Sequence, residues 1–575
     1  MDFLLISPPV SNFGQAAPAL SVLTAFLRSR GWKASQWDLG IEAFHHFHDA
    51  ENLRRCQEVL LEREADEELT SLAERVVADI TEAKATLRSP GVGADIERMR
   101  WALHTIRDAG FLLTAASGGS WVHGDSSFDV PGAMSSFEHL EMAAEDANRN
   151  PFVAYFEDFA LERLRRESPR AIGISIAYLS QLIPSLALIR VIRKHLPGVP
   201  IILGGAYLTA TGYELGRVPS STLQADAVVL HDGELALDAW LRAVLGEGPE
   251  PEIPNLFLRE GDGYRRSAVG PTPQIDLDSL PAPMWTADGL QLDQYLVPKY
   301  PIALPLSRGC YWGRCFFCNI SSQTSSSYRR RSVENAIEDI KGAMRETGSN
   351  WFDFPVDSFK PRDLQALAKA LIAEGLNIEW GAEVLLDPGF KDELLEELAR
   401  SGCRCLRFGL ESACPETLKA MNKSAKPEVS RRILGSCRAH GIRTAVMLIV
   451  GFPSETRSSL EETYDFIVEN RDRIDFLTFH GYSLVVGSPM AKDPGKFGLY
   501  LKSGRSVFAP NLPFVNTNPG GMQEDHITEF IGPMRESLRE YYPNIGELWT
   551  VGIGGWMTFA ACCEAPLEPA ALGDA

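Results

Sequence analysis

Three cysteines share one short stretch of this 575-residue chain, Ser307-Arg308-Gly309-Cys310-Tyr311-Trp312-Gly313-Arg314-Cys315-Phe316-Phe317-Cys318. Three soft thiolates on one loop can hold three corners of an iron–sulfur cube and leave the fourth iron open. An open iron is a place for chemistry, whereas a closed four-ligand site is usually structural. The apolar run 302–306 predicts a strand before the loop, and Phe317 offers a flat apolar face beside the cluster.

Size and charge exclude several classes of protein. A chain of this length is expected to form two to four domains, and its formal net charge of -20 makes nucleic acid an unlikely partner. No apolar stretch approaches the roughly 20 residues that cross a bilayer, and the amino-terminal sequence does not resemble a signal peptide. Ten cysteines without such a signal point to a reducing cytoplasm. We therefore expect a cytoplasmic protein without a membrane span.

Residues 1–250 alternate strand and helix, which predicts a Rossmann-like α/β domain with a buried parallel sheet. Strands are predicted at 3–6, 32–39, 171–176, 199–203 and 226–230. Ligands of such sheets lie beyond the carboxyl ends of the strands. Those ends carry small or turn-forming residues and one acid: Pro8, Pro9, Ser175, Gly204, Gly205, Gly233 and Glu234. Glycine lets the backbone approach a large flat ligand closely, while the glycine fingerprint of a dinucleotide site is absent from loop 7–14.

A long insertion at 41–170 interrupts this alternation with helices predicted at 51–64, 67–87 and 95–112. An insertion of this length usually forms a subdomain or a lid. It contains His45, His46 and His48, which suggest a metal at first sight. Adjacent histidines do not share a helix face, so we predict a solvated helix end.

After a linker at 251–300, residues 301–490 repeat strand and helix about six times, which predicts a partial or full (β/α) barrel. Catalytic loops of such barrels gather at the carboxyl ends of the strands. The candidate residues at these ends are Glu383, Glu411, Ser412, Gly451 and Glu455. A carboxylate there can accept hydrogen bonds from the polar groups of a bound ligand.

The small C-terminal region, 491–575, contains Tyr541, Tyr542, Trp549 and Trp556, which we interpret as packing anchors rather than as a substrate pocket. Cys562 and Cys563 are most simply buried thiols, with a second metal site as the alternative.

The cysteine loop resembles that of radical S-adenosylmethionine (SAM) enzymes, although its first gap has four residues where the family usually has three. The segments 409-GLES-412, 451-GFPSET-456 and 419-KAMNK-423 resemble further motifs of the family. The strand ends of the first domain resemble the cobalamin-binding domain that precedes many of these enzymes. The Asp-x-His-x-x-Gly signature, whose histidine binds cobalt in other cobalamin proteins, is absent. Two positions depart from the family: Leu385 stands where an arginine is frequent, and Asp357-Ser358 replaces a pair of acids.

The resemblance covers about 1–40 and 171–490 and implies three cofactors. Cys310, Cys315 and Cys318 would hold a [4Fe-4S] cluster, and Phe317, Glu383, Glu411, Ser412, Gly451 and Glu455 would contact SAM. The glycine-lined strand ends of the first domain would hold cobalamin. The sequence alone leaves open a zinc knuckle, unrelated core thiols, and a front domain that has lost its cofactor.

The implied activity is C-methylation of an unactivated carbon in natural-product or peptide maturation. The partners would be a small-molecule or peptide substrate and an electron donor such as flavodoxin or ferredoxin. Hydrogen abstraction by a radical needs no side-chain acid or base, so no catalytic residue is assigned. The alternatives are rearrangement, cyclisation or polar methylation with the same cofactors, and a cobalamin or peptide binding module with a vestigial cluster.

Overall fold

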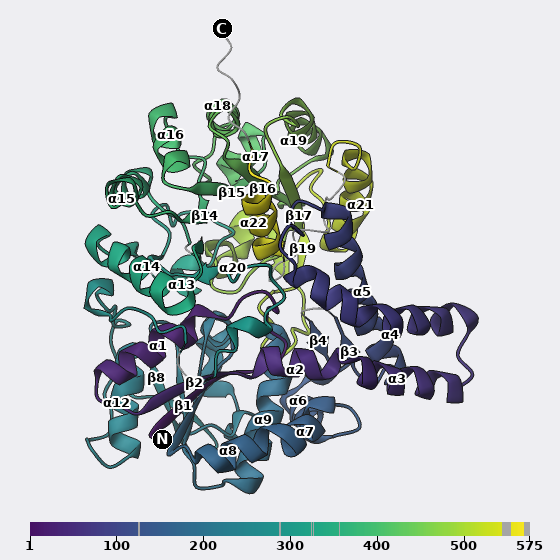
Figure 1. Cartoon of the computed structure of the whole chain (residues 1–575), viewed down its shortest axis with the longest axis vertical. Coiled ribbons are helices and arrows are strands. Elements are labelled where there is room, and N and C mark those ends of the chain that lie inside the picture. The colour runs from purple at the N-terminus through teal and green to yellow at the C-terminus, as the bar shows by residue number, and fades with distance from the viewer. Residues whose placement is uncertain are drawn as a thin grey trace. The chain divides into compact units, whose positions relative to one another are not determined.

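The computed structural model describes residues 1–124, 127–286, 289–323, 325, 327–355, 357–542 and 554–567. The chain divides into two compact units. The first comprises 1–300 with 506–509, and the second comprises 301–505 with 510–575. Both are α/β structures, as the sequence predicted (Figure 1). No helix among the described residues is long and apolar enough to cross a membrane.

The first unit is built on a seven-stranded sheet of order β2-β1-β5-β6-β7-β8-β9. Its parallel part consists of β1 (Phe3–Ser7), β2 (Ala34–Asp38), β5 (Ala171–Ser175), β6 (Ile201–Gly204) and β7 (Ala227–Val229). These are the five predicted strands, and nearly all their residues are buried, as expected for a parallel sheet covered by helices. Because β1 lies between β2 and β5, the strand order reverses beside β1, where open α/β sheets bind their ligands.

The helices that follow these strands are α1 (Pro18–Ser29), α9 (Leu182–His195) and α12 (Glu234–Val244). The segment 251–300, predicted as a linker, falls in the first unit. It supplies the antiparallel strands β8 (Leu256–Glu260) and β9 (Gly263–Arg266). Its later part follows the edge strand β2, where Asp38 N–H donates to Gly289 O over 3.2 Å. Gly289 has φ +106°, and a Cβ there would lie 1.9 Å from Gln36 O, so only glycine fits.

The insertion forms helices, as predicted: α2 (Leu39–Phe47), α3 (Ala50–Glu62), α4 (Glu67–Arg88) and α5 (Ile96–Ala116), then α6 (Phe137–Glu145), α7 (Pro151–Tyr155) and α8 (Leu161–Glu167). Helices α3, α4 and α5 pack side by side (Figure 1).

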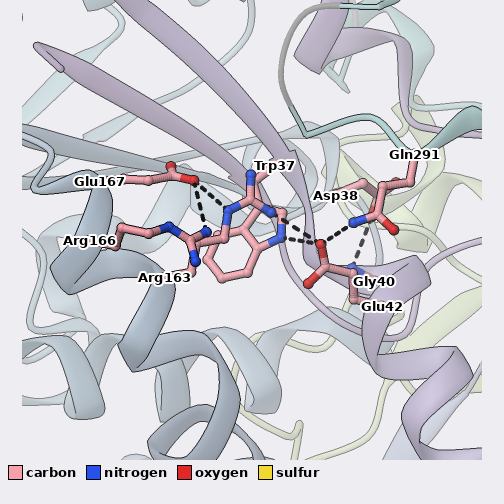
Figure 2. A network of polar contacts seen from close by, with 8 residues as sticks. All are labelled: Trp37, Asp38, Gly40, Glu42, Arg163, Arg166, Glu167 and Gln291. Carbon is pink, nitrogen blue, oxygen red and sulfur yellow. Dashed lines mark hydrogen bonds and ion pairs between the residues drawn. The ribbon is translucent and has the colours of Figure 1, made fainter.

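Figure 2 shows the polar contacts that join α8 to the edge of the sheet. One oxygen of Glu42 accepts from Trp37 Nε1 at 2.9 Å, Arg163 Nη1 at 3.1 Å and Gln291 Nε2 at 2.6 Å. Arg163 also lies over the Trp37 ring and pairs with Glu167.

The prediction of a solvated end for the histidine cluster is wrong. His48 is fully buried and stacks on Phe44, with ring centroids 4.2 Å apart, and its Nδ1 contacts Phe44 O at 3.0 Å. His45 Nε2 contacts Gln294 O at 2.8 Å. Burial lowers the pKa of His45 to about 4 and holds the pKa of His48 well below its usual range. The rings are apolar packing partners because neutral imidazole tolerates burial far better than imidazolium does.

The second unit is an open barrel of six parallel strands in sequence order. They are β10 (Ile302–Ala303), β13 (Trp351–Phe354), β14 (Glu379–Val384), β15 (Cys403–Glu411), β16 (Arg443–Val450) and β17 (Phe476–Gly481). The connecting helices are α14 (Val333–Thr347), α15 (Pro361–Ala373), α16 (Asp392–Arg400), α17 (Pro415–Ala420), α18 (Pro427–Ala439) and α19 (Arg457–Glu469). Among the described strands β10 and β17 do not pair, so the barrel is partial.

The C-terminal helix α22 (Gly554–Glu564) packs at the amino ends of these strands. Phe559 contacts the Trp351 ring edge-on and lies against Gly381, and Arg443 Nη2 donates to Ala565 O over 2.6 Å. Cys562 is fully buried in this packing, as predicted for a core thiol.

Helix α21 (Ile527–Leu538) precedes Tyr542, which is buried and donates to Ile467 O, as predicted for a packing anchor. The side chains of Trp549 and Trp556 lie outside the described part of the chain.

Candidate functional site

A pocket of about 170 Å³, open to solvent, lies at the carboxyl ends of the strands of the second unit. Six residues predicted from the sequence line it together: Cys310, Cys315, Phe317, Cys318, Glu383 and Glu411. Asp357, Leu385, Lys423 and Met447 line it as well. The structure therefore brings three thiols, three carboxylates and one ammonium group to one hollow, with apolar side chains between them.

The three thiols do not lie at the spacing of a single-ion site. Thiolates on one tetrahedral zinc, with Zn–S bonds of about 2.3 Å, lie about 3.8 Å apart. Among the described residues, the only three ligand-bearing side chains whose ligand atoms all lie within 4.8 Å of one another are Cys414, Glu416 and Glu462. The cluster cysteines are not such a group although they line one pocket. This favours a cube, in which each sulfur binds a different iron, over the zinc knuckle.

Several polar contacts hold the ends of the cysteine loop. Gly309 N–H donates to Asp357 Oδ2 at 2.6 Å, and Ile320 N–H donates to Cys318 Sγ at 3.4 Å. Gly309 has φ +84°, and a Cβ there would lie 2.3 Å from Ser327 O, so glycine is required immediately before the first cysteine. Burial raises the pKa of the Cys315 thiol to about 12 and also raises that of Cys318. Metal ligation is the ordinary way to keep such buried sulfurs deprotonated.

Glu411 and Lys423 form an ion pair inside the pocket, with Lys423 Nζ 2.8 Å from Glu411 Oε1. Their side chains are only 12% and 5% exposed. Burial by itself lowers the pKa of Lys423, but Glu411 and the thiols of Cys315 and Cys318 outweigh it and raise that pKa. Glu411 has φ +67° at a β-bulge of β15, a strained conformation for a non-glycine residue. The bulge aims its carboxylate at the pocket rather than along the strand.

A second charged group lies deeper in the barrel. Arg407 is 3% exposed and pairs with Asp353 on β13 at 2.5 Å and with Glu383 on β14 at 3.8 Å. Partial burial raises the pKa of Glu383, whose side chain is 45% exposed at the pocket, and Arg407 opposes that shift. Arg407 therefore connects the barrel interior to a carboxylate that lines the pocket. Nothing in the sequence pattern pointed to Arg407, because it lies inside an apolar strand.

Three predicted residues do not line the pocket. Ser412 is fully buried, where its hydroxyl contacts Thr463 Oγ1 at 3.0 Å and accepts from Cys414 N–H. Glu455 is also fully buried and accepts from Gly451 N–H at 2.7 Å. Its other oxygen has no hydrogen-bond partner in the described part of the chain, and burial raises the pKa of Glu455 to about 7. These contacts give Ser412, Gly451 and Glu455 local structural roles, and their contact with SAM stays a prediction.

In the first unit the predicted residues lie along the carboxyl edge of the sheet. Gln181 joins two of its loops, because its Nε2 donates to Pro8 O at 2.9 Å and its Oε1 accepts from Ala177 N–H at 2.8 Å. Pro9 is buried next to Pro8, and Ser175 ends β5 with 7% exposure. This arrangement fixes both sides of the reversal point between β1 and β5.

Glycines form the next part of this edge. Gly204 ends β6, and Gly205 has φ +111° with a hypothetical Cβ only 2.2 Å from Ile176 O. Beyond β7, His231 has φ +59° and its N–H donates to Thr209 Oγ1 at 2.9 Å. Gly233 and Glu234 follow at the start of α12, where Glu234 is 1% exposed. This edge therefore presents mainly backbone and small side chains.

A buried carboxyl at the end of β2 was not predicted. Asp38 is 1% exposed and accepts from Tyr295 Oη at 2.5 Å and from Gly40 N–H at 2.9 Å. Burial raises its pKa to about 6. Its signal in the sequence is an acid that directly follows a buried strand.

Comparison with known families agrees with this geometry. Residues 304–467 match the family model described as the radical SAM superfamily. The second unit thus carries a radical SAM domain, and the cysteine loop and the motifs at 409–412 and 451–456 fall within the matched range.

Individual relatives are more distant. An uncharacterized methyltransferase of Pyrococcus horikoshii is 29% identical over 319 residues, 54% of this chain and 66% of the relative. A bacteriochlorophyllide d C-12(1)-methyltransferase of Chlorobaculum tepidum is 29% identical over 198 residues, 33% of this chain and 42% of the relative. The chain thus spans less than two thirds of the length of either relative.

Two solved structures share the fold. The radical SAM methyltransferase TsrM from Kitasatospora setae, with cobalamin and a [4Fe-4S] cluster bound, gives a TM-score of 0.57 at 16% identity and covers 88% of this chain and 81% of its own. The cobalamin-dependent SAM radical enzyme OxsB, with aqua-cobalamin bound, gives 0.56 at 15% identity and covers 71% and 66%. At this identity the likeness concerns the fold, and it extends well beyond the radical SAM domain.

Proposed function

We propose that this chain is a cobalamin-dependent radical SAM methyltransferase that methylates an unactivated carbon of a small molecule or a peptide. The observation that carries the proposal is the pocket of the second unit, where three thiols meet the Glu411–Lys423 pair within a radical SAM domain. The methyltransferase names of the relatives and the cobalamin in both solved structures support the assignment of the first unit.

The pocket residues fit the groups of SAM by charge. Cys310, Cys315 and Cys318 would hold the cluster, which would supply the electron for reductive cleavage of SAM, and cobalamin at the edge of the first unit would supply the methyl-transfer chemistry. Lys423 is the cation for the methionine carboxylate, and Glu411 and Asp357 are acceptors for its ammonium group. Glu383, supported by Arg407, can accept from the ribose hydroxyls. Leu385 and Met447 exclude water from the space between these charged groups.

The first unit supplies a surface suited to a large flat ring. Gly204 and Gly205 remove side chains from the edge, so the backbone can approach the ring closely. Gln181 fixes the neighbouring loops before any ligand arrives, which lowers the ordering cost of binding. The Asp-x-His-x-x-Gly signature is absent from the sequence, so the lower face of the cobalt is expected to lack a histidine ligand.

The proposal is tested with protein prepared anaerobically with iron, sulfide and hydroxocobalamin, then reduced and given methyl-labelled SAM. We expect about four iron atoms per chain, labelled methylcobalamin, and 5'-deoxyadenosine in mass spectra. Cys315→Ala should lose the iron and the 5'-deoxyadenosine, while Cys56→Ala, which removes a thiol from α3, should keep both. Wild-type protein that binds no iron, or that never labels cobalamin, would refute the proposal.

A second activity has its own support. Two relatives are named anaerobic magnesium-protoporphyrin IX monomethyl ester cyclases, 24% and 23% identical to this chain. If the chain catalysed ring formation, the methyl label would stay out of the product, and 5'-deoxyadenosine would still form. The same labelling experiment, repeated with each candidate substrate, therefore separates the two activities.

A further inference from the structure

The four-residue gap between Cys310 and Cys315 is held by a short segment that follows helix α17. Trp312 Nε1 donates to Asn422 O over 2.8 Å, and Asn422 Nδ2 donates to Arg314 O over 2.8 Å. Phe316 N–H donates to Met421 O over 2.9 Å. Residues on both sides of Gly313 are thus bonded to the same asparagine.

A turn at Gly313, between these hydrogen bonds, accommodates the extra residue of the four-residue gap. Gly313 has φ +57°, and a Cβ there would lie 3.2 Å from Cys310 O. The chain therefore folds back on itself at Gly313 instead of extending from one cysteine to the next. Arg314 lies over the Trp312 ring, with the guanidinium carbon 5.6 Å from its centroid. This cation–π contact covers the outer side of the turn.

Asn422 can do this because of how α17 ends. It has φ +54°, the left-handed conformation that asparagine tolerates better than most residues. Lys423 N–H donates back to Leu418 O at 2.9 Å, which completes the helix-ending turn. Glycine is the usual residue at such a position. Asparagine there keeps the turn and adds the amide that reaches Arg314 O.

The other side of the loop has its own anchor. Tyr311 Oη donates to Asp387 Oδ2 at 3.0 Å, and Asp387 Oδ1 accepts from Gly389 N–H at 2.7 Å. Asp387 is therefore fixed by its own loop, after β14. Every residue of the four-residue gap is thus either bonded to a fixed group or turned at Gly313.

We propose that Asn422, with Trp312, is a positioning residue for the cluster: it sets the shape of the longer gap so that the sulfurs of Cys310 and Cys315 face the same pocket. This inference rests on the proposed cluster. It implies that the longer gap is built into the fold of this chain. Shortening the gap to three residues would pull either Trp312 or Arg314 away from Asn422.

The test compares three variants of the full chain. Asn422→Gly removes the amide but keeps a residue suited to φ +54°, so the helix end should be preserved. Trp312→Phe removes the indole N–H and keeps an aromatic ring, although a smaller one, in the loop. Trp351→Phe is the matched control, because Trp351 Nε1 donates to Glu379 Oε2 at 2.7 Å at the opposite ends of the strands. All are reconstituted anaerobically with iron and sulfide.

We expect Asn422→Gly and Trp312→Phe to lose iron to a chelator at least tenfold faster than wild type and to alter the electron paramagnetic resonance spectrum of the reduced cluster. Their combination should be less than additive, because both act on one turn. Trp351→Phe should match wild type in both measurements, and the Tm of Asn422→Gly should not fall. Deletion of Gly313 should lower the bound iron to less than half.

Wild-type rates of iron loss in both point variants would overturn the inference, as would full iron binding after deletion of Gly313. If the deletion variant fails to fold, the two point variants decide alone. Wild-type protein without iron would instead refute the proposed function, so the two failures are distinguishable.

Discussion

The two units use the same edge of the same kind of sheet in different ways. In the second unit, the carboxyl ends of the strands carry thiols and charged side chains, with Glu411 and Lys423 paired inside the pocket. In the first unit, the corresponding edge presents prolines, a serine and glycines. Two of its acids, Asp38 and Glu234, are almost fully buried rather than displayed.

This difference matches the chemistry of the two proposed ligands. A zwitterion bound to a metal cluster is recognised through charge-assisted hydrogen bonds from fixed side chains. A broad flat ring gains affinity from buried area and close backbone approach, for which side chains are an obstacle. We therefore expect the second unit to lose ligand binding when a charge is removed, and the first unit to lose ligand binding when side-chain volume is added.

The largest effect on stability is expected from adding one methyl group to the first unit. Gly205→Ala places a Cβ 2.2 Å from the backbone oxygen of Ile176, at φ +111°, which alanine rarely adopts. Since both the clash and the strain involve backbone, we expect a local destabilisation of about 4 kcal/mol or more. Hydrogen exchange of peptides from β5 and β6 would measure the destabilisation, and absorbance of bound cobalamin would measure the loss of binding.

Gly198→Ala is the control, because a Cβ at Gly198 meets nothing within 4 Å. It should leave both measurements unchanged. A Gly205→Ala protein with normal exchange and normal cobalamin would contradict the view that volume decides this edge.

In the second unit, the comparable test is to remove a charge. Lys423→Met leaves Glu411 buried without its partner, and breaking a buried pair in this way costs roughly 3 kcal/mol. We expect this loss in denaturant unfolding of the second unit and at least a tenfold weaker binding of SAM in equilibrium dialysis.

The double variant Lys423→Met with Glu411→Gln removes both charges and should recover much of the stability but not the SAM binding. Recovery of stability without recovery of SAM binding would show that the charge of Lys423 serves the ligand and not only the fold. If stability and SAM binding recovered together, the pair would be structural, and the charge-based account of this pocket would be wrong.

The sequence predicted the parallel strands of both units, because continuous apolar runs and helical spacing are local signals, but it did not predict β8 and β9 in the segment taken as a linker. It also predicted that Cys310, Cys315, Cys318, Glu383 and Glu411 would lie together, since each lies at or beyond the carboxyl end of a strand. It did not predict the Glu411–Lys423 pair, because the pair depends on a β-bulge and on how α17 ends. Ser412, Gly451 and Glu455 were placed at the site by motif, yet their contacts are local.

Side chains inside apolar strands were the least predictable. Arg407 and Asp353 each stand between apolar neighbours in their strands, and only the register between β13, β14 and β15 brings them together with Glu383. The prediction for the histidines near residue 45 was wrong for a related reason. Their burial depends on packing against the distant His123, Gln294 and Arg88, which no local pattern reveals.

The smallest effect on stability is expected from Asp38, the buried acid at the end of β2 in the first unit. Burial raises the pKa of Asp38 from 3.8 to about 6, so the folded chain holds this proton more tightly than the unfolded chain does. The stability from Asp38 is therefore fully present below pH 3.8 and is lost as the pH rises through 6. The loss at full ionisation is about 3 kcal/mol by linkage, and Asp38→Asn should recover about 2 kcal/mol of it, because an amide serves Tyr295 less well.

The measurement is hydrogen exchange of peptides from β1 and β2 at pH 5 and pH 8, compared between Asp38→Asn and wild type. The variant should gain stability relative to wild type as the pH rises between these values. Histidines with a lowered pKa, such as His45 and His123, act in the opposite direction, but they are present in both proteins and cancel in the difference. A difference that stays constant from pH 5 to pH 8 would mean that Asp38 is ionised throughout, and that the first unit tolerates a buried charge at its edge as the second unit does.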